Sequence, residues 1–263
     1  CYYILHFPFL ESMLVGSVIS STDAASVFSI LRSKKLGLKE NTASLLEIES
    51  GSNDPCSYML TAIMLSLIQG KASGIQTAYL IFAQFAYGLA LGFAIAFAAK
   101  FFLRKFRFTT EGFDAAFVLA IAVLAYALPS LIDGNGYLST YIVGIILGNS
   151  DIKNKKSMVH FFDGVTGLMQ MLIFFLLGLL SSPSALPSVF TQALAISLFM
   201  IIIARPLVIF GILSPIKCSI RQQLLVSWSG LRGAASIVFA IMAVVSVNTL
   251  KNDIFHIVFC IVL

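Results

Sequence analysis

Long apolar stretches recur from one end of this chain to the other, and they constrain its fold more than any other feature. Most are about as long as the ~20 residues that an α-helix needs to cross the ~30 Å hydrocarbon core of a bilayer. Eight stretches can be delimited, at 10–31, 42–68, 77–103, 112–132, 136–149, 161–180, 186–213 and 222–247. The fifth of these is short, and a ninth begins at Asp253. We predict a transmembrane helix for each stretch.

The composition excludes a soluble fold. Hydrophobic residues make up 59% of the 263 residues, charged residues make up 11%, and the mean hydropathy is +0.95. A soluble protein of this length needs a charged shell around its core, which this chain cannot supply. We therefore predict an all-α polytopic membrane protein, with residues 1–263 forming one transmembrane domain of eight full spans and a truncated ninth. Residues 1–9 look like the tail of an earlier span, so we expect a fragment that is incomplete at both ends and lacks its targeting signal.

The basic residues alternate between the loops, and this alternation predicts the topology because short cytoplasmic loops are enriched in Lys and Arg. Of the 17 basic residues, 13 follow the first, third, fifth and seventh spans, and only Lys71 and Lys251 follow the others. We expect a protein of the cell inner (plasma) membrane, and its predicted cytoplasmic loops are 32–41, 100–111, 151–160 and 214–221. The basic residues of these cytoplasmic loops account for the net charge of +5. The expected partner is therefore membrane lipid, and no nucleic acid is expected.

Polar side chains share one face of the second span, within "LLEIESGSNDPCSYML". Helical steps of 100° bring Glu47, Glu49, Ser50, Asn53 and Asp54 onto that face. A charged side chain at the bilayer centre costs at least ~2.5 to 3.5 kcal/mol, so it is expected to line a pathway or to face a partner. Helix packing alone would favour Ser, Thr or Asn over carboxylates. The face therefore predicts a functional site, with Glu47 nearer the cytoplasmic end, in a water-filled entrance.

Two further spans carry polar or glycine-rich interruptions. In "GSVISSTDAASVF" the run Ser20–Asp23 offers side-chain hydrogen bonds that compete with the helix backbone. In "SWSGLRGAASIVF" the glycines Gly230 and Gly233 flank Arg232, which lies inside the span. Unwound backbone at membrane depth is tolerated around a protein-lined cavity, and pairs of broken helices form ion sites between inverted repeats in secondary transporters. We predict two interrupted helices that cross near the middle of the membrane.

Other chemistries find little support in the sequence. The cysteines lack the short paired spacing of a zinc site or a disulfide framework, and no nucleotide loop or nucleophile elbow is present, so we expect no cofactor. A cation channel remains an alternative, although it would be expected to show a short re-entrant filter. An intramembrane enzyme is a second alternative, with Asp23 and Asp54 as an acid/base pair but without an accompanying nucleophile. Proton-dependent, saturable ion flux would distinguish an antiporter from a channel, and substrate turnover without ion gradients would indicate an enzyme.

Three motifs together, "SSTDAASVFSILR", "EIESGSNDP" and "SGLRGAAS", resemble those of the monovalent cation:proton antiporter family, in its sodium/hydrogen-exchanger branch. The likeness extends in particular to bacterial NhaP-type potassium or sodium/proton antiporters. It covers essentially the whole chain. The resemblance implies an inverted-repeat antiporter fold of about 13 helices with two broken, crossing helices, in which these spans would be the fifth onward. It also implies a transporter rather than an enzyme, without catalytic residues.

The resemblance further implies a site for a monovalent cation and a proton. Asp54 would be the carboxylate that binds either ion, preceded by Asn53 in the Asn-Asp motif of the family. Asp23 would supply or orient a ligand, Thr22 would supply a backbone carbonyl, and Ser50 would supply a hydroxyl. Carboxylate, hydroxyl and carbonyl oxygens are the ligands that Na⁺ and K⁺ prefer. Because Asn53 is neutral and cannot carry a second proton, we expect electroneutral one-for-one exchange by alternating access, serving cation and pH homeostasis.

The remaining buried charges would form a structural pair. Glu49 resembles the acid of a buried ion pair that links two core helices, but the sequence leaves open whether its partner is Arg205 or Arg232. Arg232 matches the arginine of the second broken helix. Ala24 stands where many relatives have Pro after the Thr-Asp pair, as in the potassium-exchanging subgroup, so K⁺ is slightly favoured over Na⁺. We also expect a homodimer.

Overall fold

The computed structural model describes residues 1–2, 6–23, 27, 37–39, 41–71, 73–106, 112–152, 154–247 and 253–262. Their regular secondary structure is helical, as predicted, with no strand among them. The chain folds into two compact units. Unit 1 consists of Cys1–Gln69 together with Leu177–Leu263, and unit 2 is Gly70–Leu176.

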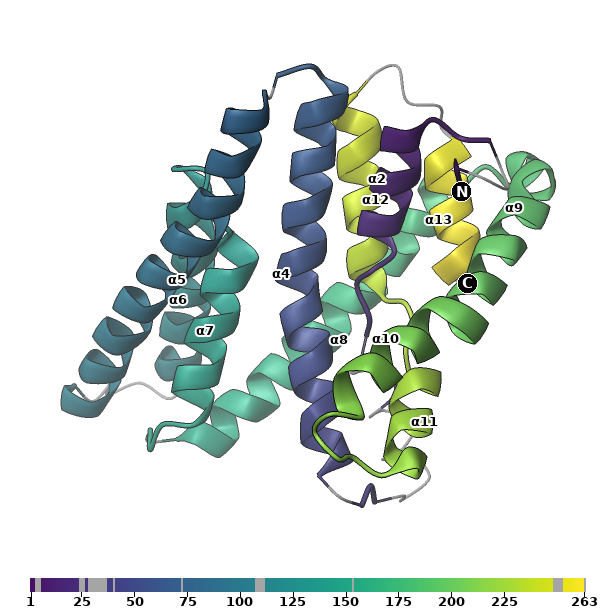
Figure 1. Ribbon diagram of the computed structural model, residues 1–263. Coiled ribbons are helices and arrows are strands. Elements are labelled where there is room, and N and C mark those ends of the chain that lie inside the picture. The colour runs from purple at the N-terminus through teal and green to yellow at the C-terminus, as the bar shows by residue number, and fades with distance from the viewer. Residues whose placement is uncertain are drawn as a thin grey trace. The chain divides into compact units, whose positions relative to one another are not determined.

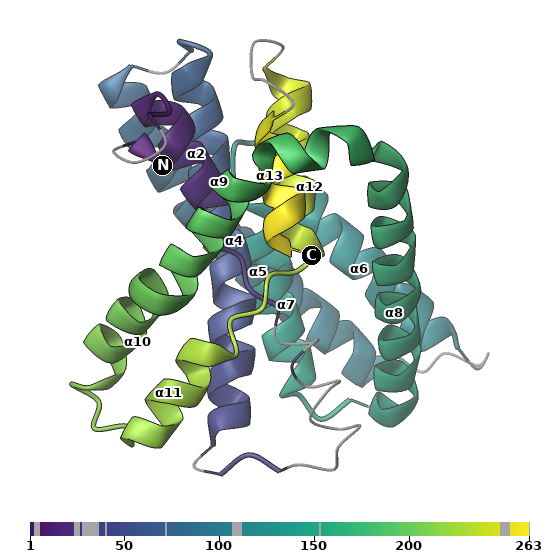
Figure 2. The ribbon, with the colours of Figure 1, turned by 90° about the vertical axis from the view of Figure 1, so that its right-hand side faces the viewer.

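Unit 1 is a bundle of helices from both ends of the chain. Its helices are α2 (Phe9–Val18), α4 (Thr42–Ile68), α9 (Leu186–Phe199), α10 (Arg205–Leu213), α11 (Ile220–Trp228), α12 (Ala234–Ser246) and α13 (Asp253–Val262). Helix α4 packs against α2, α11 and α12, while α13 packs against α9 and α12 (Figure 1). Figure 2 shows α10 and α11 side by side. The bounds of α4 are those predicted for the second span, and its polar face lies among elements from both ends of the chain.

Both predicted interruptions are present. The first span is helical to Val18, and Ser21–Asp23 are not helical; residues 24–26 and 28–36 lie outside the described residues. The eighth span consists of α11 and α12, separated by a non-helical segment at 230–233. The two breaks meet, because the Asp23 N–H donates a hydrogen bond of 2.9 Å to the carbonyl of Leu231. The prediction of two broken, crossing helices is confirmed.

The seventh span contains an irregularity that the sequence analysis did not predict. A 3-10 turn at Pro183–Ala185 precedes α9, and a π-helical turn, Met200–Ala204, separates α9 from α10. Pro206 has no N–H to donate to the carbonyl of Ile202, and a wider turn accommodates such a gap without ending the helix. Arg205 is the first residue of α10, immediately after this turn.

Unit 2 consists of apolar helices with close backbone packing. Its helices are α5 (Gly74–Lys105), α6 (Phe113–Ser130), α7 (Gly136–Gly148) and most of α8 (Lys155–Leu180). Helix α5 begins with a capping box formed by Ser73 and Gln76. A Cβ atom on Gly92 of α5 would lie 3.0 Å from the Cα of Ser139 in α7, so glycine permits this helix contact.

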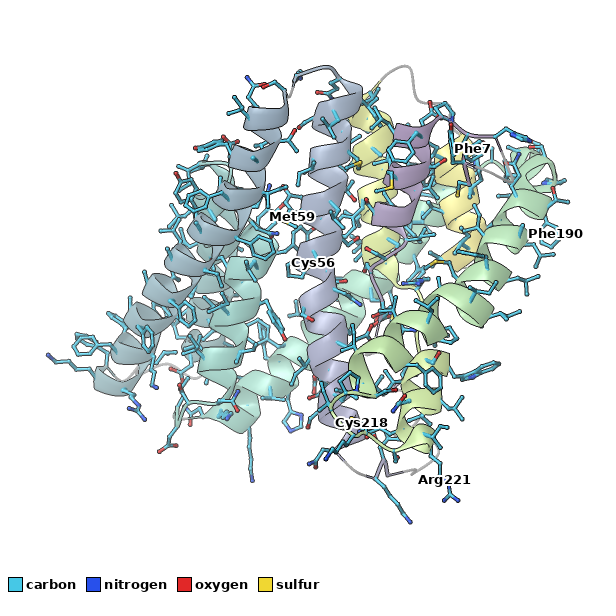
Figure 3. The ribbon with its side chains drawn as sticks, in the orientation of Figure 1. Phe7, Cys56, Met59, Phe190, Cys218 and Arg221 are labelled. Atoms are coloured by element: carbon cyan, nitrogen blue, oxygen red, sulfur yellow. The ribbon has the colours of Figure 1, made fainter. Side chains whose placement is uncertain are left out.

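Helix lengths agree with a multi-pass membrane protein. Among the described residues, four segments are long and apolar enough to cross a membrane, namely Gly74–Lys105, Phe113–Ser130, Lys155–Leu180 and Pro183–Leu213. Helix α7 has 13 residues, which corresponds to about 20 Å and is less than a full crossing. Helix α4 is a continuous helix of 27 residues, but polar side chains interrupt its apolar sequence. Many large apolar side chains face outward, such as Phe190, which points away from unit 1 in Figure 3.

The ends of the helices in unit 1 agree with the alternation of basic loops. The first residues of α4 and the connection between α10 and α11, which contains Cys218 and is followed by Arg221, lie at the same end of the unit (Figures 1 and 3). The predicted loops 32–41 and 214–221 adjoin these points. Which side of the membrane this end faces remains a prediction.

Candidate functional site

The polar face of α4 lies against the first break. The Ser50 hydroxyl donates a hydrogen bond of 2.7 Å to the carbonyl of Thr22. Asn53 and Thr22 bind one another reciprocally: Asn53 Nδ2 donates to Thr22 Oγ1, and the Thr22 N–H donates to Asn53 Oδ1 at 3.3 Å. Thr22 is 4% exposed. The interruption of the first span therefore exposes backbone groups that α4 side chains satisfy.

Asp54 lies one helical turn beyond Ser50 on α4. The hydroxyl of Ser21, which is fully buried, donates a hydrogen bond of 2.5 Å to Asp54 Oδ1. Asp23 and Glu49 add electrostatic repulsion at the Asp54 carboxylate. A positive charge bound beside Asp54 would offset this repulsion and stabilise the carboxylate.

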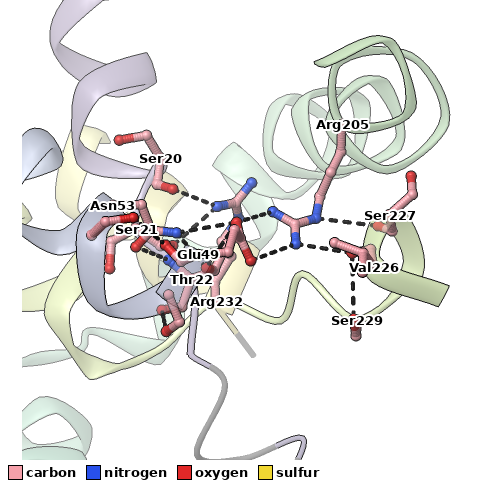
Figure 4. A network of polar contacts seen from close by, with 12 residues as sticks. Ser20, Ser21, Thr22, Glu49, Asn53, Arg205, Val226, Ser227, Ser229 and Arg232 are labelled. Carbon is pink, nitrogen blue, oxygen red and sulfur yellow. Dashed lines mark hydrogen bonds and ion pairs between the residues drawn. The ribbon is translucent and has the colours of Figure 1, made fainter. Parts of the chain in front are cut away.

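Glu49 is paired with Arg205, so the structure distinguishes between the two arginines that the sequence left open. Arg205 Nη1 and Nη2 donate to the two Glu49 carboxylate oxygens at 3.1 and 3.2 Å, and the two side chains are 10% and 25% exposed, respectively (Figure 4). The guanidinium also binds the last turn of α11, with Nε donating to Ser227 O at 3.2 Å and Nη2 donating to Val226 O at 3.1 Å. Arg205 therefore joins α4 to α11.

Arg232 makes a different set of contacts. Its Nη1 donates to the carbonyls of Ser20 and Ser21, at 3.0 Å each (Figure 4). These carbonyls follow the C-terminal end of α2, where a helix carries a partial negative charge. Asp23 lies beside Gly233, the N-cap of α12, where the partial charge is positive. Each broken end thus faces a side chain of opposite charge.

The glycines that flank Arg232 leave space for two charged groups. A Cβ atom on Gly230 would overlap the Nε and Cζ atoms of Arg205. A Cβ atom on Gly233 would lie 2.6 Å from the Cβ of Asp23. The sequence predicts these glycines as helix breakers, and in the structure they also leave space for side chains from two other elements.

All eight residues proposed from the sequence lie in this part of unit 1. They are Thr22, Asp23, Glu49, Ser50, Asn53, Asp54, Arg205 and Arg232. Glu47 is exposed and takes no part in the hydrogen bonds described above. Ser21 is a further residue of the site that the sequence did not predict, because a run of four polar residues does not indicate which hydroxyl faces Asp54.

The chemistry of the site is that of oxygen atoms around a small excess of negative charge. Within the described residues, the three carboxylates of Asp23, Glu49 and Asp54 and the guanidinium groups of Arg205 and Arg232 give a net charge of −1. In the same part of the chain, no group of three or more His, Cys, Asp or Glu side chains could hold a metal ion. Carboxylate, hydroxyl and carbonyl oxygens suit a hard cation with one positive charge.

Comparison with known proteins gives a consistent result. A family model described as "Sodium/hydrogen exchanger, transmembrane" matches residues 1–263. The chain is 36% identical over 240 residues to the K⁺/H⁺ antiporter NhaP of Alkalimonas amylolytica, and 34% identical over 243 residues to the K⁺/H⁺ antiporter NhaP2 of Shewanella sp. (strain ANA-3). Each match covers 91% of this chain, which spans 42% of the length of the relative.

A solved structure shares the fold. The sodium proton antiporter MjNhaP1 from Methanocaldococcus jannaschii at pH 8 superposes with a TM-score of 0.81. The match covers 99% of this chain and 69% of the other, at 24% sequence identity. At this identity the likeness establishes the fold and leaves the transported ion to other arguments.

Proposed function

The chain belongs to the sodium/hydrogen exchanger family, and we propose that the protein containing it exchanges a monovalent cation, K⁺ or Na⁺, for a proton across the membrane. The observation that carries this proposal is the single net negative charge of a site in which Asp54 lies among hydroxyl and carbonyl oxygens. One cation or one proton neutralises that charge. The two ions therefore compete for one carboxylate.

Competition at Asp54 also accounts for coupling. If the protein changes between inward-open and outward-open states only when Asp54 is neutralised, one cation crosses in one direction for each proton in the other. Other charges of the site already have partners in the protein, because Glu49 is paired with Arg205 and Arg232 is bound to backbone carbonyls. Because Asn53 cannot take up a second proton, the exchange is electroneutral.

We assign the site residues as follows. Asp54 binds the cation or proton, with Ser50, the Thr22 carbonyl and Asn53 as neighbouring oxygen donors and Asp23 as a second acid that supplies or orients a ligand. Glu49 and Arg205 form the structural ion pair, and Arg232 stabilises the first break. The close contacts among Ser50, Thr22 and Asn53 support this assignment, because they bring oxygen atoms from α4 and from unwound backbone together.

We propose K⁺ as the preferred cation. Two relatives at 36% and 34% identity are named K⁺/H⁺ antiporters, and Ala24 follows Asp23 in this chain, as in the potassium-exchanging subgroup. We further propose that residues 1–263 belong to one exchanger domain of a homodimer in the cell inner membrane, with the basic loops in the cytoplasm. The alternation of basic residues supports this orientation.

The test uses the full-length protein in proteoliposomes that contain a pH-sensitive dye. Pulses of K⁺ or Na⁺ are added to wild type and to Asp54→Asn at several pH values. Wild type should release protons in a saturable manner, more effectively with K⁺, and the rate should not change when a membrane potential is imposed. Asp54→Asn should show no cation-evoked proton movement. A matched variant outside the site, Asp114→Asn at the start of α6, should keep wild-type exchange.

The same assay separates the alternatives. Cation flux that does not saturate and does not move protons would favour a channel. The intramembrane enzyme has lost its support, because the family consists of transporters. Exchange that persists in Asp54→Asn would refute the assignment of Asp54.

A further inference from the structure

Ser21 is the residue of the first break that contacts Asp54, the carboxylate proposed to bind the cation or the proton. Among the side chains that the structure describes, its hydroxyl is the one that donates a hydrogen bond to Asp54, at 2.5 Å from Oδ1. The side chain is fully buried. Water therefore does not readily replace this donor.

Two serines on α4 differ from Ser21 in the groups to which they donate hydrogen bonds. The Ser50 hydroxyl donates to the carbonyl of Thr22 at 2.7 Å, and the Ser57 hydroxyl donates to the carbonyl of Ser17 at 2.6 Å. Both bind backbone groups whose charge does not change with pH. Ser21 instead binds a group that gains and loses a proton during exchange.

A donor in this position distinguishes between the two forms of Asp54. The hydroxyl hydrogen is attracted more strongly to a carboxylate than to a neutral carboxyl group, so the contact favours the deprotonated form. The deprotonated form is the one that binds a cation. We propose that Ser21 is a positioning residue, whose hydroxyl holds the Asp54 carboxylate toward the unwound backbone of the first break, where it binds the cation. This inference rests on the proposed exchange function.

The backbone of Ser21 is fixed from the second broken helix. Its carbonyl accepts hydrogen bonds from Arg232 Nη1 at 3.0 Å and from the Ser236 hydroxyl at 3.4 Å. The hydroxyl therefore contacts α4, while Arg232 of the second break and Ser236 of α12 hold the carbonyl. The contact between the two broken helices thus fixes the backbone of Ser21 and, with it, the position of the Ser21 hydroxyl.

Charged groups on the neighbouring elements also act on Asp54, and the test must leave them in place. Glu49 on α4 and Asp23 in the first break repel the Asp54 carboxylate. Arg232 in the second break and Arg205 on α10 bind the neighbouring backbone and Glu49, respectively. Helix α12 has no charged side chain, and the one in α2, Glu11, is in its first turn. Replacing Ser21 by Ala removes one neutral donor and none of these charges.

The experiment measures exchange against pH for wild type, Ser21→Ala and Ser21→Thr, in proteoliposomes of the full-length protein. Loss of a hydrogen bond to a charged group should move the midpoint of the Ser21→Ala profile by about one pH unit toward alkaline pH. Well below that midpoint, the apparent KM for K⁺ should rise about tenfold, because protons compete better. The maximal rate at high pH should stay near wild type. Ser21→Thr, which keeps a hydroxyl, should keep the wild-type midpoint.

Ser57→Ala is the matched control, because it removes a buried serine hydroxyl that binds a carbonyl. Its pH profile should be that of wild type. A Ser21→Ala profile with an unchanged midpoint, or with a shift toward acid pH, would overturn the inference. If Ser21→Ala does not fold, Ser21→Cys replaces it; its weaker donor should give a smaller alkaline shift, and no shift would overturn the inference. Absence of exchange in wild type, or its persistence in Asp54→Asn, would instead refute the proposed function.

Discussion

The two breaks in unit 1 are similar in their backbone and different in their chemistry. Each follows the C-terminal end of a short helix, where an arginine binds backbone carbonyls. Arg232 binds the carbonyls of Ser20 and Ser21, just after α2, and Arg205 binds those of the last turn of α11. The first break supplies hydroxyl groups to α4 from Ser21 and Thr22. The second contains Gly230 and Gly233, which supply space. From this comparison we propose that the first break forms the ion site and that the second break holds it in position.

The largest effect that would test this comparison is expected at Arg205. Arg205→Ala removes the partner of Glu49 and two donors to α11, and leaves a carboxylate that is 25% exposed without its guanidinium. Breaking one side of a buried ion pair costs about 3 to 5 kcal/mol. We expect a markedly lower thermal midpoint in detergent and poor expression. Unfolding of purified protein, followed by light scattering or intrinsic fluorescence, measures it.

The control for Arg205 is the double variant Glu49→Gln with Arg205→Gln. It removes both charges together, so it should be more stable than Arg205→Ala. If the two variants are equally destabilised, the contacts of Arg205 with α11 matter more than its pairing with Glu49.

Arg232 should have the second largest effect. Arg232→Gln removes the charged donor to the carbonyls of Ser20 and Ser21, and hydrogen bonds from charged groups contribute about 1.5 to 3 kcal/mol each. Because Ser21 is attached to the same contact, we expect altered cation affinity along with a lower thermal midpoint. Arg205→Gln should lower stability more and is the matched comparison. An Arg232→Gln protein with wild-type stability and affinity would show that the first break does not depend on the second.

Gly230 tests whether the second break supplies space. Gly230→Ala places a methyl group on the Arg205 guanidinium, and overpacking of this kind costs about 1 to 3 kcal/mol. The matched control is Gly211→Ala in α10, where a Cβ atom would have no neighbour within 4 Å. Thermal midpoints should fall for the first and stay the same or rise for the second. In an Arg205→Ala background, Gly230→Ala should cost much less, and additive costs would contradict the steric explanation.

Much of the fold could be predicted from the sequence because lipid imposes simple rules. The apolar stretches predicted helices, and the bounds of α4 agree with the prediction at both ends. The two interruptions were also predicted, since polar runs and paired glycines stand out in apolar helices. The π-helical turn before Arg205 was not predicted. A proline in a helix indicates a disturbance, but its form depends on how neighbouring helices take up the freed carbonyl.

The sequence predicted which residues lie together in the candidate site better than it predicted which of them pair with one another. Position on one helical face brought Glu49, Ser50, Asn53 and Asp54 together. The choice between two buried arginines depended on how α10 and α11 pack, which periodicity does not encode. The contact between Ser21 and Asp54 could not be predicted for the same reason, because hydroxyl groups in an unwound segment have no fixed period.

The smallest expected effect compares a neutral with a charged partner for carbonyls at the end of α2. Ser57 donates to Ser17 O at 2.6 Å, close to the carbonyls that bind Arg232. Ser57→Ala removes one neutral hydrogen bond, which contributes about 0.5 to 1.5 kcal/mol. The thermal midpoint should fall less than in Arg232→Gln, and Ser57→Thr, which keeps the hydroxyl, should recover part of the loss. If Ser57→Ala destabilises the protein as much as Arg232→Gln does, the charge of the arginine is not what stabilises the first break. Its effect would then be ascribed to hydrogen bonding alone.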